Sequence, residues 1–449
     1  MRPLDIYFVA IGGTGMAPLA CLLQELGHRV RGADGPLYPP MSDLLAAAGI
    51  EPLVGWDPAH LEPPQPAPDL VIVGNAVPRH NPEAETVERL GFERLSMPEA
   101  LARFFLASRR PLVVAGTHGK TTTTAMAAWV WSQCGADPGY LIGGAPLGFA
   151  RGFEIGTGPR FVIEGDEYNA AYFDRGPKFL HYRPQTLILT SVEYDHADLY
   201  PDPEALLDAY RRLVRLLPPD GLLVACGDSA EVRAVAAEAA CAAVFYGLGE
   251  GNDVGPAELA GVHLPMPGDH NFSNALAVWA AARHDGLPEP AVRQALASFR
   301  GVRRRLEEIG EVRGVTVVDD FAHHPTAVEM SLQGLRQRHP GRRLVAMFEP
   351  RSLTAGRELF FDAYCRAFAN ADVVLLAPIF HHQRLGDERL DRDAVVSRLR
   401  SSGVDAAACV STDEVLAKAV AGARPGDVLV TMSSGSFDGL PRRLLAALG

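Results

Sequence analysis

The chain has 449 residues, a length that predicts two or three domains rather than one core. Its 47% apolar and 21% charged residues are typical of a soluble globular protein, and its net charge of −12 argues against a nucleic-acid or membrane-surface binder. The six cysteines are scattered, the strand-like start does not indicate a signal peptide, and no apolar run approaches the roughly 20 residues that span a bilayer. We therefore expect a cytoplasmic protein with reduced thiols, no membrane insertion and no obligate protein partner.

Residues 1–108 predict a Rossmann-like domain, with strands at 6–11, 28–32 and 70–73 and a helix at 16–26. The turn Gly12-Gly13-Thr14-Gly15-Met16 lies between the first strand and the helix, where backbone N–H groups and the helix N-terminus would meet an anion. Asp34 follows about twenty residues later, as in a dinucleotide fingerprint. Pro18 replaces the third glycine of that fingerprint, so a sugar-nucleotide diphosphate fits as well as NAD, and a tight structural turn is the alternative.

Residues 109–300 predict a central domain with a parallel sheet like that of P-loop ATPases. A strand at 111–115, the turn Gly116-Thr117-His118-Gly119 and a helix at 121–133 form a phosphate-binding arrangement. In it Lys120 would reach the β- and γ-phosphates of ATP and the Thr121 hydroxyl would hold Mg²⁺, with Thr122 beside them. The alternative is a plain turn with an exposed lysine. Further strands are expected at 161–164, 186–190 and 222–225, and helices at 271–283 and 291–299.

Acidic and histidine side chains follow two of these central strands. Glu164 ends one strand, and Asp195-His196-x-Asp198 follows another, at the sheet edge where parallel α/β sheets bind ligands. Glu164 is therefore a candidate Mg²⁺ ligand and His196 a ligand or an orienting group, the alternatives being a solvated acidic turn and a structural histidine. Asn271 and Asn274 share one helix face and could read a purine edge, although Asn271 could instead cap the helix.

Residues 301–449 predict a second Rossmann-like domain with strands at 315–318, 343–348, 373–377 and 428–432. It opens with Arg303-Arg304-Arg305, in which one arginine could stabilise a moving phosphoryl group, although such runs are usually solvated. Asp320, in the string Asp-Asp-Phe-Ala-His-His-Pro-Thr, could accept from ribose hydroxyls, and the adjacent histidines could cap the next helix. Arg351, which follows the next strand, could pair with a substrate carboxylate.

Taken in order, seven short motifs resemble the Mur ligase family from end to end. The phosphate loop has Val114 where a general phosphate loop has glycine, and its shorter Gly-Thr-x-Gly-Lys-Thr form is shared by Mur ligases and folylpolyglutamate synthetases. The motifs are Gly-Gly-Thr-Gly-Met, Gly-Thr-His-Gly-Lys-Thr, Glu-x-Asp-Glu, Asp-His-x-Asp, His-Asn-x-x-Asn, Arg-Arg-Leu-Glu and the Asp-Asp-Phe string.

The resemblance implies roles for particular residues. It assigns Lys120, Glu164, His196 and Arg305 to catalysis, and Thr121, Glu164 and His196 to Mg²⁺. It places ATP on the phosphate loop, Asn271, Asn274, Arg305 and Asp320, and the UDP-sugar on Gly12 to Met16, Asp34 and Asn75. Glu349 and Arg351 are implied to bind an incoming peptide.

Four stretches, 38–42, 143–146, 173–184 and 348–352, resemble the branch of this family that recycles cell-wall peptide. That resemblance implies an ATP-dependent ligase that joins UDP-N-acetylmuramate to L-alanyl-γ-D-glutamyl-meso-diaminopimelate through an acyl phosphate, with closure of the third domain near Arg300-Gly301. Departures concern substrate recognition and the second metal rather than the type of reaction. Leu353 stands where Asn is expected, Asn169 where Asp is expected, and Val214 near the position of a carbamylated lysine in many relatives.

Three alternatives remain open at this point. The nearest is a ligase that adds free L-alanine to UDP-N-acetylmuramate. An NAD-dependent oxidoreductase built on the first domain is a second, and a nucleotide-binding regulator without catalytic activity is a third.

Overall fold

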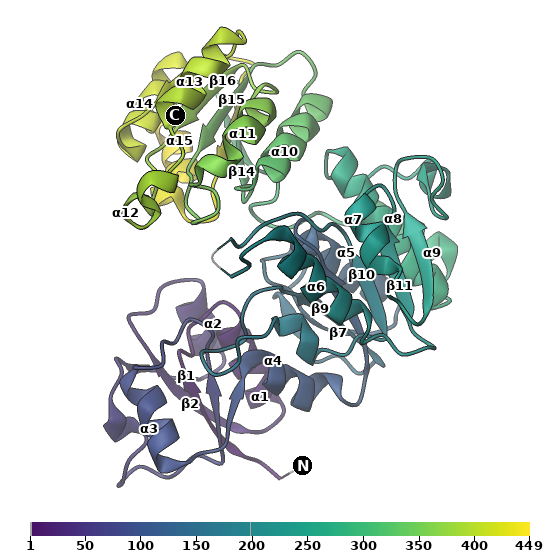
Figure 1. Cartoon of the computed structure of the whole chain (residues 1–449), viewed down its shortest axis with the longest axis vertical. Helices are drawn as coiled ribbons and strands as arrows, with labels where there is room; N and C mark the ends of the chain where they lie inside the picture. Colours follow the sequence, from purple (N-terminus) through teal and green to yellow (C-terminus); the bar gives the residue numbers. More distant parts are fainter. Residues whose placement is uncertain (1, 198) are drawn as a thin grey trace.

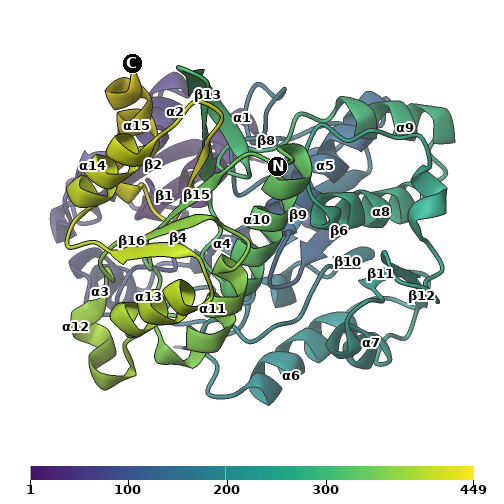
Figure 2. The same cartoon turned by 90° about the horizontal axis from the view of Figure 1, so that it is seen from above.

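The computed structural model describes residues 2–197 and 199–449, and it has three sheets, each flanked by helices (Figure 1). In Figure 1 the third part (green and yellow) lies above the first part (purple and blue), with the central part to one side, and in Figure 2, seen from above, the third part lies in front of the first. The α/β class and the three-part arrangement expected from the sequence are confirmed. Among the described residues, no helix is both long enough and apolar enough to cross a membrane.

The first sheet has five parallel strands in the order β3-β2-β1-β4-β5. Ile6 and Phe8 of its first strand pack on one face of the sheet, and Tyr7 and Val9 on the other, as a strand covered on both sides requires. The elements are β1 (Asp5–Val9), α1 (Met16–Glu25), β2 (Arg29–Asp34), α2 (Met41–Ala47), β3 (Leu53–Val54), β4 (Leu70–Val73), α3 (Pro82–Leu90), β5 (Arg94–Ser96) and α4 (Met97–Leu101). The expected first strand ends early, because Ala10 turns the backbone with a φ of 69°.

The central sheet has seven strands in the order β12-β11-β10-β6-β9-β7-β8. The short edge strand β8 pairs antiparallel with β7, and the other described strands of this sheet pair in parallel. The elements are β6 (Arg110–Ala115), α5 (Lys120–Gln133), β7 (Gly139–Leu141), β8 (Phe153–Glu154), β9 (Arg160–Gly165), β10 (Thr186–Leu189), α6 (Pro203–Val214), β11 (Leu222–Cys226), α7 (Ala230–Ala236), β12 (Ala242–Tyr246), α8 (Asp269–His284) and α9 (Glu289–Ser298). Leu112 and Val114 pack with α5, α8 and α9, whereas Val113 and Ala115 face the core shared with α6 and α7.

The third sheet has six strands in the order β13-β14-β18-β15-β16-β17, with β13 antiparallel at one edge. The elements are β13 (Glu307–Val312), β14 (Val315–Asp320), α10 (Pro325–Arg338), β15 (Leu344–Phe348), α11 (Phe361–Phe368), β16 (Val373–Leu376), α12 (His382–Leu385), α13 (Arg392–Ser401), β17 (Asp405–Ala408), α14 (Thr412–Gly422), β18 (Val428–Met432) and α15 (Leu440–Leu448). Helices α10, α11 and α13 cover one face, and α14 and α15 cover the other.

Candidate active site

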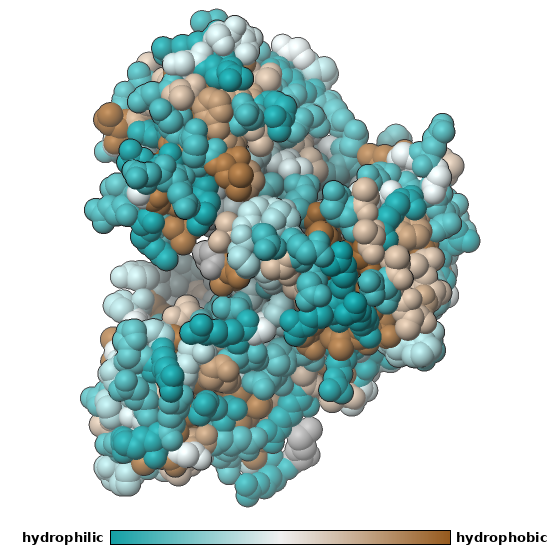
Figure 3. Space-filling view, in the orientation of Figure 1, coloured by the Kyte–Doolittle hydropathy of each residue, from teal (hydrophilic) through white to brown (hydrophobic). Residues whose placement is uncertain are grey.

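A cavity of about 690 Å³ lies where the three parts of the chain meet. In Figure 3 the surface is hollowed between the first and third parts, with mostly hydrophilic residues around the hollow. The sequence-predicted residues that line the cavity are Thr14, Gly15, Thr117, His118, Gly119, Lys120, Thr121, Thr122, Glu164, His196, Asn271, Asn274, Arg305 and Asp320.

The predicted phosphate loop joins β6 to α5, and two of its glycines have positive φ, 131° at Gly116 and 81° at Gly119. A Cβ on Gly116 would lie 2.2 Å from Thr190 Oγ1, so only glycine fits there. The Thr117 hydroxyl donates to the Glu193 carbonyl at 3.0 Å and ties the loop to the segment after β10. The loop and the N-terminus of α5 therefore present the arrangement that binds phosphates elsewhere.

Lys120, the first residue of α5, is held by a buried carboxylate. Its Nζ donates to Glu167 Oε2 at 3.0 Å and to the Gly116 carbonyl at 2.6 Å. Burial is the largest single influence and by itself lowers the lysine pKa, but the charges of Glu167, Asp166 and Glu164 and the hydrogen bond to Glu167 together raise it. The ammonium therefore stays protonated at the mouth of the loop.

Glu164 lies at the end of β9 and faces the first turn of α5. Its Oε2 accepts from Thr121 Oγ1 at 2.9 Å, and its Oε1 accepts from the Gly143 N–H at 2.5 Å. Burial, reinforced by the charge of Asp166, raises the pKa of this carboxyl. From the third part of the chain, Arg305 Nη2 approaches Thr121 Oγ1 to 3.3 Å, so an arginine expected to face phosphate does point into the central site.

His196 adopts a φ of 54°, which is uncommon for a residue with a side chain. Its Nε2 lies 3.2 Å from Glu167 Oε1. Burial lowers the histidine pKa, but the hydrogen bond to Glu167 and the charge of Asp195 raise it overall. The motif's second aspartate, Asp198, lies outside the described residues.

Asn271 and Asn274 are buried on one face of α8 and line the cavity. Asn271 is not the N-cap, because α8 begins at Asp269 after Gly268, and its Nδ2 instead donates to the Pro267 carbonyl at 2.6 Å. Asn274 lies against the phosphate loop, since a Cβ on Gly119 would come within 2.9 Å of its Oδ1.

Asp320, expected at a ribose, has both carboxylate oxygens engaged with its own part of the chain. Oδ2 accepts from the Leu306 N–H at 2.7 Å, and Oδ1 accepts from the Ala322 N–H at 2.7 Å and from Ser331 Oγ at 3.2 Å. The side chain therefore holds the segment before β13 to the end of β14, besides lining the cavity. His324 caps α10 by accepting from the Thr326 N–H at 3.4 Å, so the expectation that a histidine caps this helix is confirmed.

The predicted diphosphate turn lies before α1, which begins at Met16. The Gly12 N–H donates to Asp34 Oδ2 at 2.7 Å, so the aspartate braces the turn. Thr14 and Gly15 line the cavity, but Gly12, Gly13, Met16, Asp34 and Asn75 are outside its lining residues. Asn75 is exposed just after β4, at the same sheet edge as the turn.

Glu349 and Arg351 follow β15 and lie beside the cavity rather than in its lining. The buried Glu349 accepts from Ser433 Oγ at 2.5 Å, and Arg351 lies 3.4 Å from Glu349 Oε1 and over the Phe380 ring. Ser434, the next residue after Ser433, does line the cavity.

The three departures from the family pattern have ordinary structural surroundings. Leu353 packs against the core of the third sheet, and Val214 is buried at the end of α6. Asn169 pairs with Pro177 through an isolated β-bridge.

Sequence reasoning did not assign Glu167 as the partner of Lys120, or Asp166, Tyr168 and Lys178 as lining residues. Lys178 Nζ lies 3.4 Å from Asp166 Oδ2 and 4.2 Å from the centre of the Tyr168 ring. A compositional signal was present, because only three lysines occur in the chain and two of them line this cavity.

Comparison with known proteins shows which family the chain resembles. Three profiles match in order: "Mur ligase family, catalytic domain" at residues 5–109, "Mur ligase middle domain" at 114–282 and "Mur ligase, glutamate ligase domain" at 304–435. The UDP-N-acetylmuramate–L-alanyl-gamma-D-glutamyl-meso-2,6-diaminoheptandioate ligase of Escherichia coli K12 is 40% identical, over 99% of this chain and 98% of its own. The UDP-N-acetylmuramate–L-alanine ligase of Halorhodospira halophila is 34% identical, over 99% of this chain and 93% of its own.

Among solved structures, a murein peptide ligase from Psychrobacter arcticus 273-4 superposes with a TM-score of 0.73 at 34% identity, covering 99% of each chain. Family profiles, full-length relatives and fold agree with one another. The chain belongs to the Mur ligase family.

Proposed function

We propose that this protein is an ATP-dependent ligase that joins UDP-N-acetylmuramate to the tripeptide L-alanyl-γ-D-glutamyl-meso-diaminopimelate in the cytoplasm, as a step of peptidoglycan recycling. The observation that carries the proposal is the convergence of Lys120 from the central sheet, Arg305 from the third part and Thr14 from the first on one cavity. A reaction between a nucleotide, a sugar nucleotide and a peptide needs three binding surfaces that meet at one point. The chain presents such a meeting point.

The first bond to form lies between the lactyl carboxylate of the sugar nucleotide and the γ-phosphorus of ATP. ADP leaves and an acyl phosphate remains, so the carboxylate carbon is activated. Lys120 and Arg305 would offset the charge that accumulates between two anions, since both point to the same end of α5.

The second bond forms when the free amino group of the peptide's L-alanine attacks the acyl carbon and expels phosphate, with loss of a proton from the amine. Water must be kept away from the acyl phosphate. Closure of the third part over the central one would exclude water, and Gly301, with a φ of 91°, connects the two after α9. Glu349 and Arg351 would receive the charged groups of the peptide at the rim.

The residues present fit a magnesium ion. Glu164 is a half-buried carboxylate beside the Thr121 hydroxyl, and such oxygen donors are those that Mg²⁺ prefers. Glu164, Thr121 and His196 would hold the ion, which would supply positive charge to the nucleotide phosphates.

The second candidate is a ligase that adds free L-alanine. It would activate UDP-N-acetylmuramate with ATP in the same way, but its amine substrate would be L-alanine instead of the tripeptide. The higher identity to the tripeptide ligase than to the alanine ligase, 40% against 34% over comparable lengths, favours the tripeptide. The three matching family profiles describe ligases, which argues against an oxidoreductase. A nucleotide-binding regulator without activity would not need Lys120, Glu164 and Arg305 arranged around one cavity.

Phosphate release from ATP, measured with UDP-N-acetylmuramate and either the tripeptide or L-alanine, tests the proposal. We expect turnover with the tripeptide well above that with alanine, and mass spectrometry should find the UDP-muramyl tripeptide. Lys120→Ala should reduce turnover by about 10²-fold or more through lost charge stabilisation.

Lys418→Ala is the matched control, because the Lys418 side chain is 45% exposed and forms an ion pair with Glu414 on α14, away from the cavity lining. Retention of ATP by the wild-type enzyme in the presence of both substrates would overturn the proposal. Faster turnover with alanine than with the tripeptide would favour the second candidate.

A further inference from the structure

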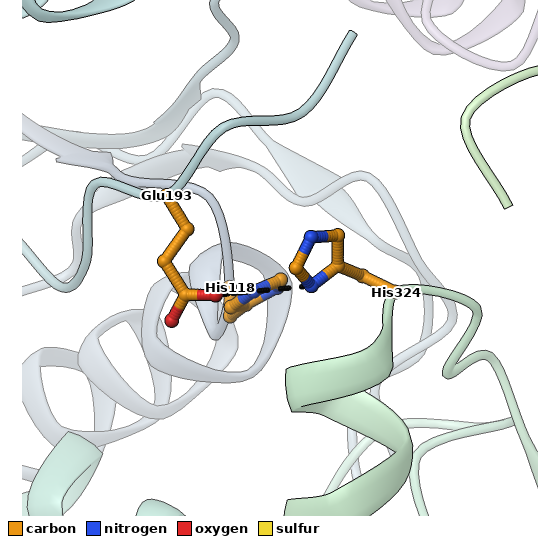
Figure 4. Close-up of side chains that lie close together, drawn as sticks. All are labelled: His118, Glu193 and His324. Atoms are coloured by element: carbon orange, nitrogen blue, oxygen red, sulfur yellow. Dashed lines mark hydrogen bonds and ion pairs between the residues drawn. The ribbon is translucent and has the colours of Figure 1, made fainter. Parts of the chain in front are cut away.

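Two histidines and a glutamate meet where the central part contacts the third part (Figure 4), and one of them, His118, also lines the cavity. His118 belongs to the loop after β6, Glu193 follows β10, and His324 precedes α10. His118 Nε2 lies 3.3 Å from Glu193 Oε2, and His324 Nδ1 lies 3.8 Å from the same oxygen. The three ligand atoms all lie within 4.8 Å of one another.

Contacts with neighbouring residues also fix the side chains of this cluster. Thr326 Oγ1 donates to Glu193 Oε2 at 2.5 Å, and the His118 and His324 rings lie 4.8 Å apart between centroids. His324 is 6% exposed, and its Nε2 is buried with no hydrogen-bond partner among the described residues. Its Nδ1 accepts the 3.4 Å helix-cap bond from the Thr326 N–H, so this nitrogen carries a lone pair, and it lies 3.8 Å from Glu193 Oε2.

Two imidazole nitrogens and one carboxylate form a donor set that zinc takes in proteins, with a fourth position left for water. The set differs from the oxygen donors at Glu164 and Thr121, which suit magnesium. We propose that His118, Glu193 and His324 form a zinc-binding site that joins the central and third parts of the chain, separate from the magnesium site.

Zinc at this position would inhibit turnover, because its ligands come from both sides of a contact that must move. His118 and Glu193 belong to the central part, and His324 to the third part. A bound ion would resist separation of the two parts and would hold His118 of the phosphate loop away from nucleotide. This inference goes beyond the proposed function, since it concerns an ion that the ligase reaction does not require.

A second group of possible ligands, Glu99, Asp174 and His181, lies between the first part and the insert after β9. There Glu99 Oε2 already accepts from the Ser96 N–H at 2.7 Å and from Ser96 Oγ at 2.9 Å in a capping box. The cap bonds that a metal would compete with here, at 2.7 and 2.9 Å, are shorter than the 3.4 Å cap bond of His324. This group is therefore the weaker candidate and serves as an internal comparison.

The test is calorimetric titration of the full-length, chelator-treated protein with Zn²⁺ in the presence of excess Mg²⁺. We expect one equivalent of zinc, and intense visible absorption of four-coordinate cobalt when Co²⁺ replaces it. Glu193→Gln and His324→Gln should each weaken zinc binding by about 100-fold or more, because each removes a direct ligand.

His181→Gln and Glu164→Gln are the matched controls, and both should leave the zinc affinity within about threefold of wild type, a margin well inside the 100-fold effect of ligand loss. Circular dichroism checks that each variant folds. If His324→Gln does not fold, Glu193→Gln still tests the site, because the Glu193 side chain is partly exposed. Unchanged zinc binding in Glu193→Gln would overturn the inference. So would loss of zinc binding in either control, or the absence of a four-coordinate cobalt spectrum.

Discussion

Lys120 Nζ lies 3.0 Å from Glu167 Oε2, so the lysine expected to hold phosphate is paired with a carboxylate whose side chain is 2% exposed. The other oxygen of Glu167 lies 3.2 Å from His196 Nε2. Burial raises the pKa of Glu167, but the charges of Lys120 and His196 lower it overall. One buried carboxylate therefore positions two groups proposed for catalysis.

Replacing Glu167 with glutamine should destabilise the central part of the protein. The change leaves the Lys120 ammonium without its buried counter-charge, and breaking a buried ion pair costs about 3–5 kcal/mol. The midpoint of thermal unfolding should fall by at least about 6 °C. Glu204→Gln is the control, because Glu204 pairs with Arg211 at the surface, where ion pairs contribute little to stability. Equal shifts in the two variants would show that the Glu167 pair is unimportant for stability.

Replacing Arg305 with alanine should reduce turnover by about 10³-fold or more, because an arginine aimed at a transferring phosphoryl group stabilises its transition state by that order. Phosphate release under saturating substrates measures the effect. Arg303→Ala is the neighbouring control, since the Arg303 side chain is 60% exposed and lies 3.7 Å from Glu307. Comparable losses in both variants would argue that general charge, rather than the direction of Arg305, matters.

Asp320→Ala should lower stability as well as ATP binding, because it leaves the buried N–H groups of Leu306 and Ala322 without their acceptor. An unsatisfied buried donor costs about 1–3 kcal/mol. Thermal unfolding and the KM for ATP together separate the two effects, with Asp362→Ala on the exposed face of α11 as control. An unchanged unfolding midpoint with a raised KM would show that the carboxylate acts on nucleotide alone.

Acidification should destabilise the protein through His270. Burial lowers the pKa of this histidine to about 4, with the charges of Arg305 and His118 adding to the effect and Asp269 opposing it. Between the ordinary value of 6.5 and about 4 the unfolded chain binds more protons than the folded one, so stability falls as pH falls. At pH 5 the loss is about 2 kcal/mol relative to neutral pH.

His270→Asn removes the titrating group and should make the decline between pH 7 and pH 5 smaller, as measured by urea unfolding. His263→Asn, at an exposed histidine in the preceding loop, should decline like wild type. A parallel decline in all three proteins would remove His270 as the source of the acid sensitivity.

The amino-acid sequence by itself determined the strands that bury both faces and the loops that follow them. Strands β4 and β18 were predicted with the observed bounds, because each is a short, largely apolar run that follows an aspartate, with Thr431 the one polar residue within β18. The loop at Gly116 to Lys120 could also be predicted, since its glycines and lysine act over a few adjacent residues. Short strands such as β3, with two exposed residues, carry no such signal, and neither do the antiparallel edges β8 and β13.

Only the tertiary structure decided which polar groups meet. Glu167 pairs with Lys120 across 47 positions, and Arg305 reaches Thr121 across 184 positions, so no local pattern records either contact. The structure also shows that the Asp320 carboxylate, expected at a ribose, accepts from the backbone N–H groups of Leu306 and Ala322. Local sequence specifies turns and strands because their forces act between neighbours. Charge pairs between distant segments depend on how the three sheets pack, and packing is a property of the whole chain.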